Sequence, residues 1–413
     1  MTGINSNGIS GTVPDASAAE NIVRFAAAAG AVTRTPLVVA CDGTPAARLL
    51  MRAVAAAVCS RGCPVLSGGV LYSGAVRDLL TRRECGGALL VGSPAPGRIG
   101  VRRLGADGRD ADGADMETLW DAYDNGTAPG TPAEETPLAA APVIAGYLDT
   151  LEHAVDAAAI RRSAMKCAID FANDAAASLA GEMTRVFGLE VLGFQNSGTA
   201  AAQAARQLGL SAAFGFSPSG DALLIGSPDG VWLPSETAFA VAAHYRCRCI
   251  EGGQVVISGG NGLLVEEAVR RAGGKHVAGD AAGDFYGVDG SFGFGGFPGF
   301  DVFHMMLLLL EAAAVNRRPP AEWVHLLPPL HLVDAALPWN EFHMGRITAL
   351  RGRLGDARMS CCGDTCRFEE SGCRVSCRPD PASGTLAIRA AARKLSDARE
   401  RAATIRQLLG GGR

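Results

Sequence analysis

The first third of the chain alternates short apolar runs with longer segments of helical periodicity. Three short apolar runs are predicted strands: Leu37–Ala40, Val65–Leu66 and Ala88–Val91. Two segments between them carry apolar residues at helical spacing: Ala46–Cys59 and Ala75–Arg83. Strands that alternate with helices are typical of parallel pairing with crossover helices. The pattern therefore predicts an α/β domain, which ends in a short helix around Met116–Tyr123 and an extended linker.

The same alternation continues through the rest of the chain. It predicts strands at Cys167–Asp170, Glu190–Leu192, Ala212–Phe216, Leu223–Ile225, Gln254–Ile257 and Thr385–Ala390. It predicts helices at Ala175–Val186, Ala200–Leu208, Thr237–Tyr245, Leu263–Ala272, Val302–Val315 and Ser396–Leu409. We therefore expect three α/β domains in residues 1–140, 141–233 and 234–338, and a smaller α+β domain in residues 339–413.

The composition is that of a globular protein with several domains. The 413 residues are 48% hydrophobic and 19% charged, which is enough for several cores of about 100 residues each. A net charge of −4 gives no indication of a nucleic-acid partner. The longest apolar stretch, Met305–Leu310, is too short to span a bilayer, and the polar start Met1–Ser10 lacks a secretory signal. We therefore expect a cytoplasmic protein that binds neither nucleic acid nor membranes.

The twelve cysteines indicate reduced thiols, since a long chain without a secretory signal is typical of a reducing compartment. Five of them gather near the C-terminus: Cys361, Cys362, Cys366, Cys373 and Cys377. Their spacing is not a pair of CxxC motifs, and their surroundings alternate like strands joined by turns. Two interpretations stay open for this cluster: a zinc site, or buried and edge thiols on a small sheet.

A polar loop between two apolar strands carries the first chemical signal. It reads Ser217-Pro218-Ser219-Gly220-Asp221-Ala222, and the second strand ends in a turn at Asp229-Gly230. This loop resembles the metal loop of the α-D-phosphohexomutases, the phosphoglucomutase and phosphomannomutase family, in which Asp-Gly-Asp-Ala-Asp-Arg holds magnesium. Here Asp221 remains, while Ser217 and Ser219 replace two carboxylates. Because magnesium prefers charged oxygen ligands, the resemblance implies a weak Mg²⁺ site; the alternative is a loop kept for its backbone path.

A second loop matches the family's phosphoserine loop, which reads Thr-Ala-Ser-His-Asn-Pro. Here the strand Ala88–Val91 runs into Gly92-Ser93-Pro94-Ala95-Pro96. The resemblance places Ser93 at the serine that carries the transferred phosphate, while proline and alanine replace the family's histidine and asparagine. A serine at a strand end can carry a phosphate. It is also common in an ordinary Pro/Gly turn.

Further family positions have lost their charged groups. Gly100–Leu104 stands where the family has Asn-Gly-Ile-Lys-Leu, so the resemblance implies that Arg103 replaces a lysine proposed to transfer protons. An arginine is a poor base but can bind phosphate. Gly8–Gly11 matches a Gly-Ile-Arg-Gly loop with Ser10 in place of the arginine, and Cys41–Thr44 matches Arg-Asp-Thr-Arg without either basic residue.

The last two domains carry partial matches to the family's sugar and phosphate loops. Gly287–Phe292 resembles Gly-Glu-Glu-Ser-Gly-His. Arg378-Pro379 followed by Ser383-Gly384-Thr385 resembles Arg-Pro-Ser-Gly-Thr-Glu-Pro, although the same tripeptide is an ordinary hairpin turn. The residues that the resemblance implies for substrate and phosphate binding are Asp289, Ser291, Ser383, Gly384, Thr385 and Arg389.

The resemblance covers nearly the whole chain and implies a four-domain phosphohexomutase-like architecture: three α/β/α domains with mixed sheets and a C-terminal α+β domain. It suggests two functions. Scaffold residues persist where charged site residues do not, which favours a catalytically impaired or inactive relative with a binding or regulatory role. The alternative is an active phosphosugar mutase that transfers phosphate through Ser93. The expected ligand is a hexose phosphate or related small molecule, or else a protein partner.

Overall fold

The structure is a computed structural model of the chain. It describes residues 3–5, 8–13, 15–111, 113–128, 130–217, 222–249, 254–257, 263–278, 284–286, 292–293, 301–327, 329–338, 347, 357–362, 365–370, 372–380 and 385–410. The chain divides into two compact units. Unit 1 comprises residues 1–233 and 293–321, and unit 2 comprises residues 234–292 and 322–413.

Unit 1 begins with a mixed seven-stranded sheet in the order β1-β2-β6-β5-β3-β4-β7. Its strands are β1 (Gly3–Asn5), β2 (Gly8–Thr12), β3 (Leu37–Cys41), β4 (Val65–Val70), β5 (Ala88–Gly92), β6 (Arg98–Leu104) and β7 (Glu135–Pro137). Its helices are α1 (Ala16–Val32), α2 (Pro45–Cys59), α3 (Ser73–Arg82), α4 (Gly113–Asn125) and α5 (Ala140–Ala154). The expected parallel pairing holds for β3, β4, β5 and β7, whereas β6 runs antiparallel to β5 and to β2.

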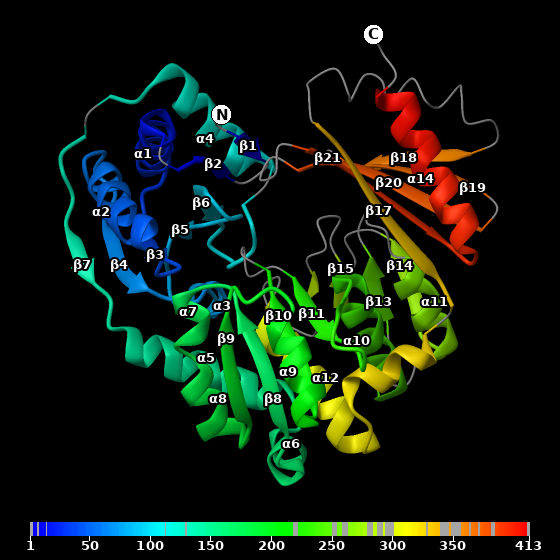
Figure 1. The fold of residues 1–413 in the computed structure, drawn as a ribbon. Helices are drawn as coiled ribbons and strands as arrows, with labels where there is room; N and C mark the ends of the chain where they lie inside the picture. The colour runs from blue at the N-terminus through cyan, green and yellow to red at the C-terminus, as the bar shows by residue number, and fades with distance from the viewer. Residues whose placement is uncertain are drawn as a thin grey trace. The chain divides into compact units, whose positions relative to one another are not determined.

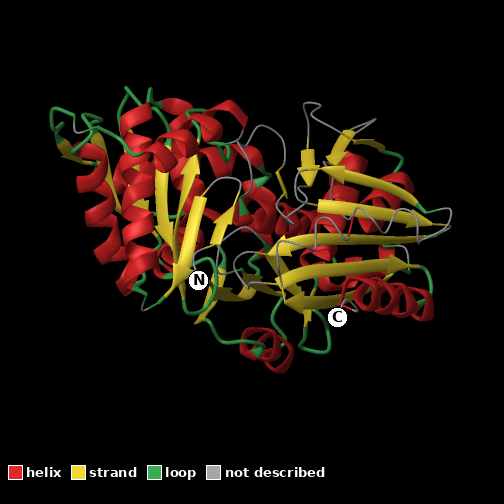
Figure 2. Ribbon diagram, turned by 90° about the horizontal axis from the view of Figure 1, so that it is seen from above, coloured by secondary structure: helices red, strands yellow, loops and turns green. Residues whose placement is uncertain are grey.

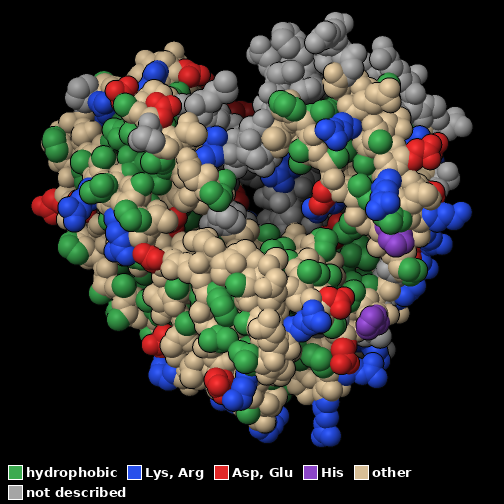
Figure 3. Space-filling view, viewed as in Figure 1, with side chains coloured by type: hydrophobic (Ala, Val, Ile, Leu, Met, Phe, Trp, Pro, Cys, Tyr) green, Lys and Arg blue, Asp and Glu red, His purple; other side chains and the backbone are tan. Residues whose placement is uncertain are grey.

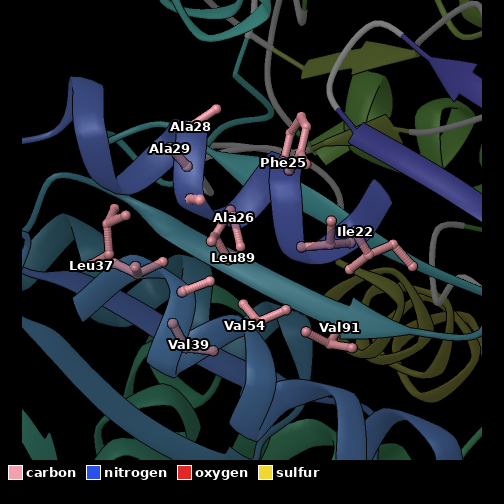
Figure 4. Packing of buried hydrophobic residues seen from close by; sticks show 14 of the residues in the cluster. Ile22, Phe25, Ala26, Ala28, Ala29, Leu37, Val39, Val54, Leu89 and Val91 are labelled. Atoms are coloured by element: carbon pink, nitrogen blue, oxygen red, sulfur yellow. The ribbon is translucent and has the colours of Figure 1, made fainter. Parts of the chain in front are cut away.

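The core of this sheet lies beneath α1 and α2. Figure 4 shows Ile22 and Phe25 of α1 in one buried cluster with Val39 of β3 and Val91 of β5, and all four side chains are at most 1% exposed. Because successive strand residues point to opposite faces, Val38 faces the other side, and it is also fully buried. The sheet is therefore covered on both faces, as an α/β/α domain requires.

A second sheet of unit 1 has the order β12-β11-β10-β8-β9 (Figure 1). Its strands are β8 (Lys166–Phe171), β9 (Glu190–Gln195), β10 (Ala212–Phe216), β11 (Leu223–Gly226) and β12 (Trp232–Leu233). Its helices are α6 (Ala157–Ser163), α7 (Asp174–Ala177), α8 (Ala180–Phe187) and α9 (Ala200–Leu208). Strands β9, β8 and β10 are parallel, and strands form at each of the four segments predicted from the sequence.

Helix α12 (Val302–Asn316) groups with unit 1, although the sequence suggested a place for it in the third domain. Phe303 lies at its start, with ring centroids 5.0 Å from those of Tyr72 and Phe216. Tyr147 donates a hydrogen bond to the buried carboxylate of Asp301, at 2.8 Å from Oδ2. Aromatic packing and this buried hydrogen bond tie α12 to unit 1.

Unit 2 contains a four-stranded sheet in the order β14-β13-β15-β16 and a five-stranded sheet in the order β17-β21-β20-β19-β18. The strands of the first are β13 (Gln254–Ile257), β14 (Lys275–Ala278), β15 (Asp284–Tyr286) and β16 (Phe292–Gly293), with helices α10 (Ser235–Cys249) and α11 (Leu263–Arg271). Those of the second are β17 (His331–Pro338), β18 (Arg358–Cys362), β19 (Thr365–Glu370), β20 (Cys373–Asp380) and β21 (Thr385–Ala392), with helix α14 (Leu395–Gly410). A short 3-10 helix, η1, spans Pro320–Leu326.

The last sheet is fully antiparallel, and α14 lies along one of its faces (Figure 2). Ile388 and Cys377 of the sheet pack against Ile405 and Leu409 of α14, and all four are at most 1% exposed. Strand β17 ends at Pro338, before the expected domain start at residue 339, and its partner is β21. The division into four domains remains a proposal; the four sheets are what the structure describes.

Two expectations need correction. The segment Gly8–Gly11, expected as a loop, lies in strand β2, because β1 and β6 flank it with antiparallel partners. The expectation of reduced thiols is wrong for Cys366, which is disulfide-bonded, while Cys373 and Cys377 are free. Antiparallel pairing of β18 with β19 sets Cys361 directly opposite Cys366. In the described part of the chain, no group of three or more His, Cys, Asp or Glu side chains could hold a metal ion.

Charged side chains of both signs are spread over the face shown in Figure 3. Among the described residues, no helix has both the length and the apolar character needed to cross a bilayer.

Candidate functional site

The carboxyl ends of β3 and β5 bring two polar residues together. The strands are parallel neighbours, so their ends lie at the same edge of the sheet. Asp42 follows β3 and Ser93 follows β5, and the Ser93 backbone N–H donates to Asp42 Oδ2 at 2.7 Å. This edge is where open α/β sheets usually bind ligands. It is therefore the candidate site of unit 1.

The Ser93 hydroxyl is turned toward its own loop. Ser93 Oγ lies 2.9 Å from the carbonyl oxygen of Ala95 and 2.9 Å from that of Arg98. A hydroxyl has one proton and donates it to one of the two carbonyls at a time. The side chain is half-buried. Both described partners of this oxygen are hydrogen-bond acceptors, so the hydroxyl serves to close the turn between β5 and β6.

Asp42 organises the loop before α2. Its Oδ1 accepts from the Thr44 backbone N–H at 2.9 Å and from Thr44 Oγ1 at 2.8 Å. Gly43 has a φ of 92°, and a Cβ at this position would lie 2.7 Å from Asp174 Cβ. Sequence reasoning passed over Asp42 because the basic residues around it were gone. The signal that could have found it is an aspartate directly before Gly-Thr-Pro at a helix start.

Arg98 places a guanidinium beside the same loop. Its Nη2 donates to Ser10 Oγ at 3.0 Å, and Ser10 is buried in β2. Its Nε is buried and has no hydrogen-bond partner among the described residues. Ser10 stands where the resemblance leads one to expect an arginine. Arg98 was also missed from the sequence, because only the pairing of β2 with β6 brings it to Ser10.

The structure does not bring Arg103 to Ser93. Arg103 pairs with Leu89 in β5, four residues before Ser93. Its Nη2 donates to the carbonyl oxygen of Gly86 at 2.6 Å, and burial lowers the pKa of the guanidinium to about 10. It therefore stays charged at neutral pH and fixes the start of β5.

The predicted metal loop begins at Ser217, directly after β10. The Ser217 N–H donates to the Ala222 carbonyl at 2.9 Å, and Ser217 Oγ accepts from the Ala222 N–H at 2.9 Å. The hydroxyl thus helps to close the connection between β10 and β11. The other predicted ligands, Ser219 and Asp221, lie outside the described residues. Ser217, the one described residue among the three predicted ligands, hydrogen-bonds to the backbone of Ala222.

In unit 2 only two of the predicted phosphate-binding residues are described. Arg389 of β21 forms a two-bond ion pair with Asp334 of β17, at 2.6 Å and 3.1 Å. Thr385 opens β21 opposite Pro338 and Asp380. The remaining predicted residues lie outside the described part of the chain: Asp289, Ser291, Ser383 and Gly384.

Solved structures match the fold of this chain along its whole length. A Thermus thermophilus protein assigned to the phosphomannomutases superposes with a TM-score of 0.77 at 16% identity, and the match covers 99% of both chains. A phosphoglucomutase/phosphomannomutase family protein from Burkholderia thailandensis gives 0.74 at 16% identity, covering 98% of this chain and 97% of that one. The chain has the phosphohexomutase fold.

The open form of a Paramecium phosphoglucomutase, parafusin, has the same fold. Its TM-score is 0.71 at 11% identity, with 99% of this chain and 95% of that chain covered. No family model and no curated protein matches the sequence. At these identities the likeness concerns the phosphohexomutase fold alone.

Within the phosphohexomutase fold, the candidate site differs from the set expected from the sequence. Ser93 forms hydrogen bonds with the Asp42 carboxylate and the Arg98 carbonyl oxygen. The Arg103 guanidinium is not among its described partners, since Arg103 lies opposite Leu89. The described polar groups nearest to Ser93 are a carboxylate and two carbonyls. This environment has negative character, and the Arg98 guanidinium, at the start of β6, lies beside the same loop.

Proposed function

We propose that this protein is a phosphohexomutase-like protein whose phosphoryl transfer is impaired or absent, and that its scaffold serves a binding or regulatory role. The observation that carries the proposal is the orientation of the Ser93 hydroxyl, which lies 2.9 Å from two backbone carbonyl oxygens. A serine that carries a phosphate needs donors and cations around its oxygen.

The surroundings of Ser93 would oppose a phosphate. Phosphorylation removes the hydroxyl proton and adds a charge of about −1.5 to −2 beside carbonyl oxygens. The Ser93 N–H, which could otherwise donate to that phosphate, is bonded to Asp42 Oδ2 at 2.7 Å. In enzymes, each missing donor to a transferring group typically costs a factor of about 10² to 10³ in rate. The loss of several donors supports a protein with little or no turnover.

The proposed ligand is a hexose phosphate or a related small molecule. A serine-to-alanine variant of the Aspergillus fumigatus N-acetylphosphoglucosamine mutase, with a TM-score of 0.52 to this chain, was solved in complex with glucose 1,6-bisphosphate. In this chain the Arg98 Nε, buried without a described partner, supplies a donor for an anion. A weak magnesium site at Ser217, Ser219 and Asp221 stays part of the proposal; of these three, only Ser217 is described, and its hydroxyl accepts from the Ala222 N–H.

Intact-mass spectrometry tests the proposal directly. The full-length protein and the Ser93→Ala variant are incubated with glucose 1,6-bisphosphate. The conversion between the 1-phosphate and the 6-phosphate of glucose, and separately of mannose, is assayed in parallel. We expect no phosphate on Ser93 and equal, background turnover for both proteins. Stoichiometric labelling that Ser93→Ala abolishes, together with turnover, would overturn the proposal.

An active phosphosugar mutase is the second candidate, and Arg98 is the observation that favours it. Its guanidinium donates to Ser10, at the position where the resemblance places a phosphate-binding arginine. If turnover is found, Arg98→Ala should lower it by about 10². Arg103→Lys, which keeps the charge at a site away from Ser93, should leave it near the wild-type value.

A further inference from the structure

Strand β9 is an exposed outer strand of the second sheet. It follows β8 as the last strand in the order β12-β11-β10-β8-β9. Leu192 is 40% exposed, and Glu190, Gly193 and Gln195 are exposed as well. In front of β9 and α9, the surface in Figure 3 shows few charged side chains.

The hydrogen-bonding phase of β9 shows which groups point outward. The Glu190 N–H donates to the Met165 carbonyl at 3.0 Å, so Glu190 faces the β8 side. Backbone groups alternate along a strand, so those of Val191, Gly193 and Gln195 point away from β8. Within the described residues, no hydrogen bond to these outward groups is found.

The edge lacks the usual protection against pairing. Outer strands of soluble proteins are commonly blocked by lysine, proline, a bulge or a covering element. β9 reads Glu-Val-Leu-Gly-Phe-Gln, and its pairing with β8 is continuous from Glu190 to Gln195. Its single charged residue, Glu190, is paired with Lys166 at 2.7 Å. The edge is therefore nearly neutral, regular and apolar.

We propose that β9 pairs antiparallel with β9 of a second copy of this chain, so that two five-stranded sheets join across a twofold axis. The outward groups allow a register with Gly193 opposite Gly193 of the second copy. Val191 then faces Gln195, and Leu192 faces Phe194, each pair occurring twice. In this register no like charges oppose each other, because Glu190 meets Asn196.

Neighbouring registers fit less well. A shift by two residues sets Glu190 opposite Phe194, and the opposite shift sets Leu192 opposite Asn196. The central register alone forms two apolar Leu–Phe pairs at the closely spaced, non-hydrogen-bonded positions. Asn196, with a φ of 50°, ends the strand and limits the pairing to this segment.

Sedimentation velocity over a concentration series tests the pairing in the full-length protein. We expect the wild type to dimerise reversibly. Gly193→Pro removes the outward N–H at the twofold axis without removing a bond to β8, and outer strands tolerate proline. A Cβ at Gly193 would lie 3.4 Å from the Phe171 ring, which is ordinary contact. Gly193→Pro and Leu192→Lys should each raise the dissociation constant about tenfold or more.

Leu49→Lys is the matched control, because Leu49 is 72% exposed on α2, in the first sheet's domain. It should leave the dissociation constant at the wild-type value. Circular dichroism confirms that each variant is folded. A wild type that stays monomeric at its highest soluble concentration would overturn the proposal, whether or not another protein binds β9. A dimer that both β9 variants leave intact would overturn it too.

Discussion

Polar side chains at the strand ends of unit 1 mostly accept hydrogen bonds from the backbone of strand-end loops. Asp42 accepts from the N–H groups of Thr44 and Ser93, and Ser217 accepts from Ala222. Asp170, near the end of β8, accepts from the Ser197 N–H and hydroxyl, each at 3.0 Å from Oδ2. These side chains keep the strand-end loops in place, because their oxygens accept hydrogen bonds from the protein itself.

Glu236 is a buried carboxyl of unit 2 whose ionisation is coupled to folding. It is 0% exposed at the start of α10, and its Oε1 accepts from the Leu264 N–H at 3.3 Å. Its Oε2 has no hydrogen-bond partner among the described residues. Burial raises the pKa of this carboxyl to about 7, although Arg389 and Arg374 act in the opposite direction.

Glu236→Gln should change the pH dependence of unfolding. A raised pKa favours the protonated folded form, so this group's contribution is fully present below the unfolded pKa of 4.5 and is lost as the pH rises to about 7. One pKa unit corresponds to about 1.4 kcal/mol. The free energy of unfolding of the variant should therefore rise relative to that of the wild type by up to about 3 kcal/mol across this pH range. Urea unfolding at about pH 5 and about pH 8 measures the difference. Parallel pH profiles of the two proteins would contradict the assignment.

At the scale of elements, the contact between α1 and α2 depends on one glycine. A Cβ at Gly30 of α1 would lie 2.7 Å from the Val58 carbonyl oxygen and 2.9 Å from Val58 Cα in α2. These are backbone atoms and cannot rotate away. The two helices therefore approach each other closely over the core shown in Figure 4.

Gly30→Ala should destabilise the protein by about 1–3 kcal/mol, since the clash outweighs the higher helix propensity of alanine. Gly181 in α8 is the matched control, because a Cβ there meets nothing within 4 Å. Gly181→Ala should be neutral or stabilising by up to about 1 kcal/mol. Thermal and urea unfolding compare the two variants. Equal effects of the two substitutions would show that the close approach of the helices does not contribute to the free energy of unfolding.

Most elements could be predicted because their apolar spacing is local. α9 and β13 have the predicted bounds, and α2 and α14 differ by a residue at their ends. The helix expected at Ala175–Val186 is instead two helices, α7 and α8, since Ser178 and Leu179 form a turn between them. Such a break depends on how each short helix packs, which the spacing does not contain.

At the scale of the molecule, unit 1 is completed by a helix from far along the chain. The α12 residues from Val302 to Leu310 are at most 2% exposed. Asp301 begins the helix by accepting from the His304 N–H at 2.9 Å, and it also accepts from Tyr147. A helix that is apolar all round is stable only when other elements surround it.

A fragment of residues 1–233 should therefore fail to fold cooperatively. It would expose the aromatic faces of Tyr72, Phe171 and Phe216 that Phe303 covers. Joining residues 293–321 to it by a flexible Gly/Ser linker should restore solubility and a cooperative transition. Near-ultraviolet circular dichroism and urea unfolding compare the two proteins. A cooperatively folded 1–233 fragment would show that α12 is dispensable for unit 1.

The sequence by itself determined the alternation of strands and helices, the fold class, and the position of Ser93 at a strand end, because each of these depends on neighbouring residues. Only the tertiary structure decided that Ser10 lies in a strand, that Arg98 rather than Arg103 belongs to the loop of Ser93, and that α12 completes unit 1. The register of antiparallel strands and the burial of a helix join residues distant in the chain. No local pattern encodes which of several arginines a register brings to one edge.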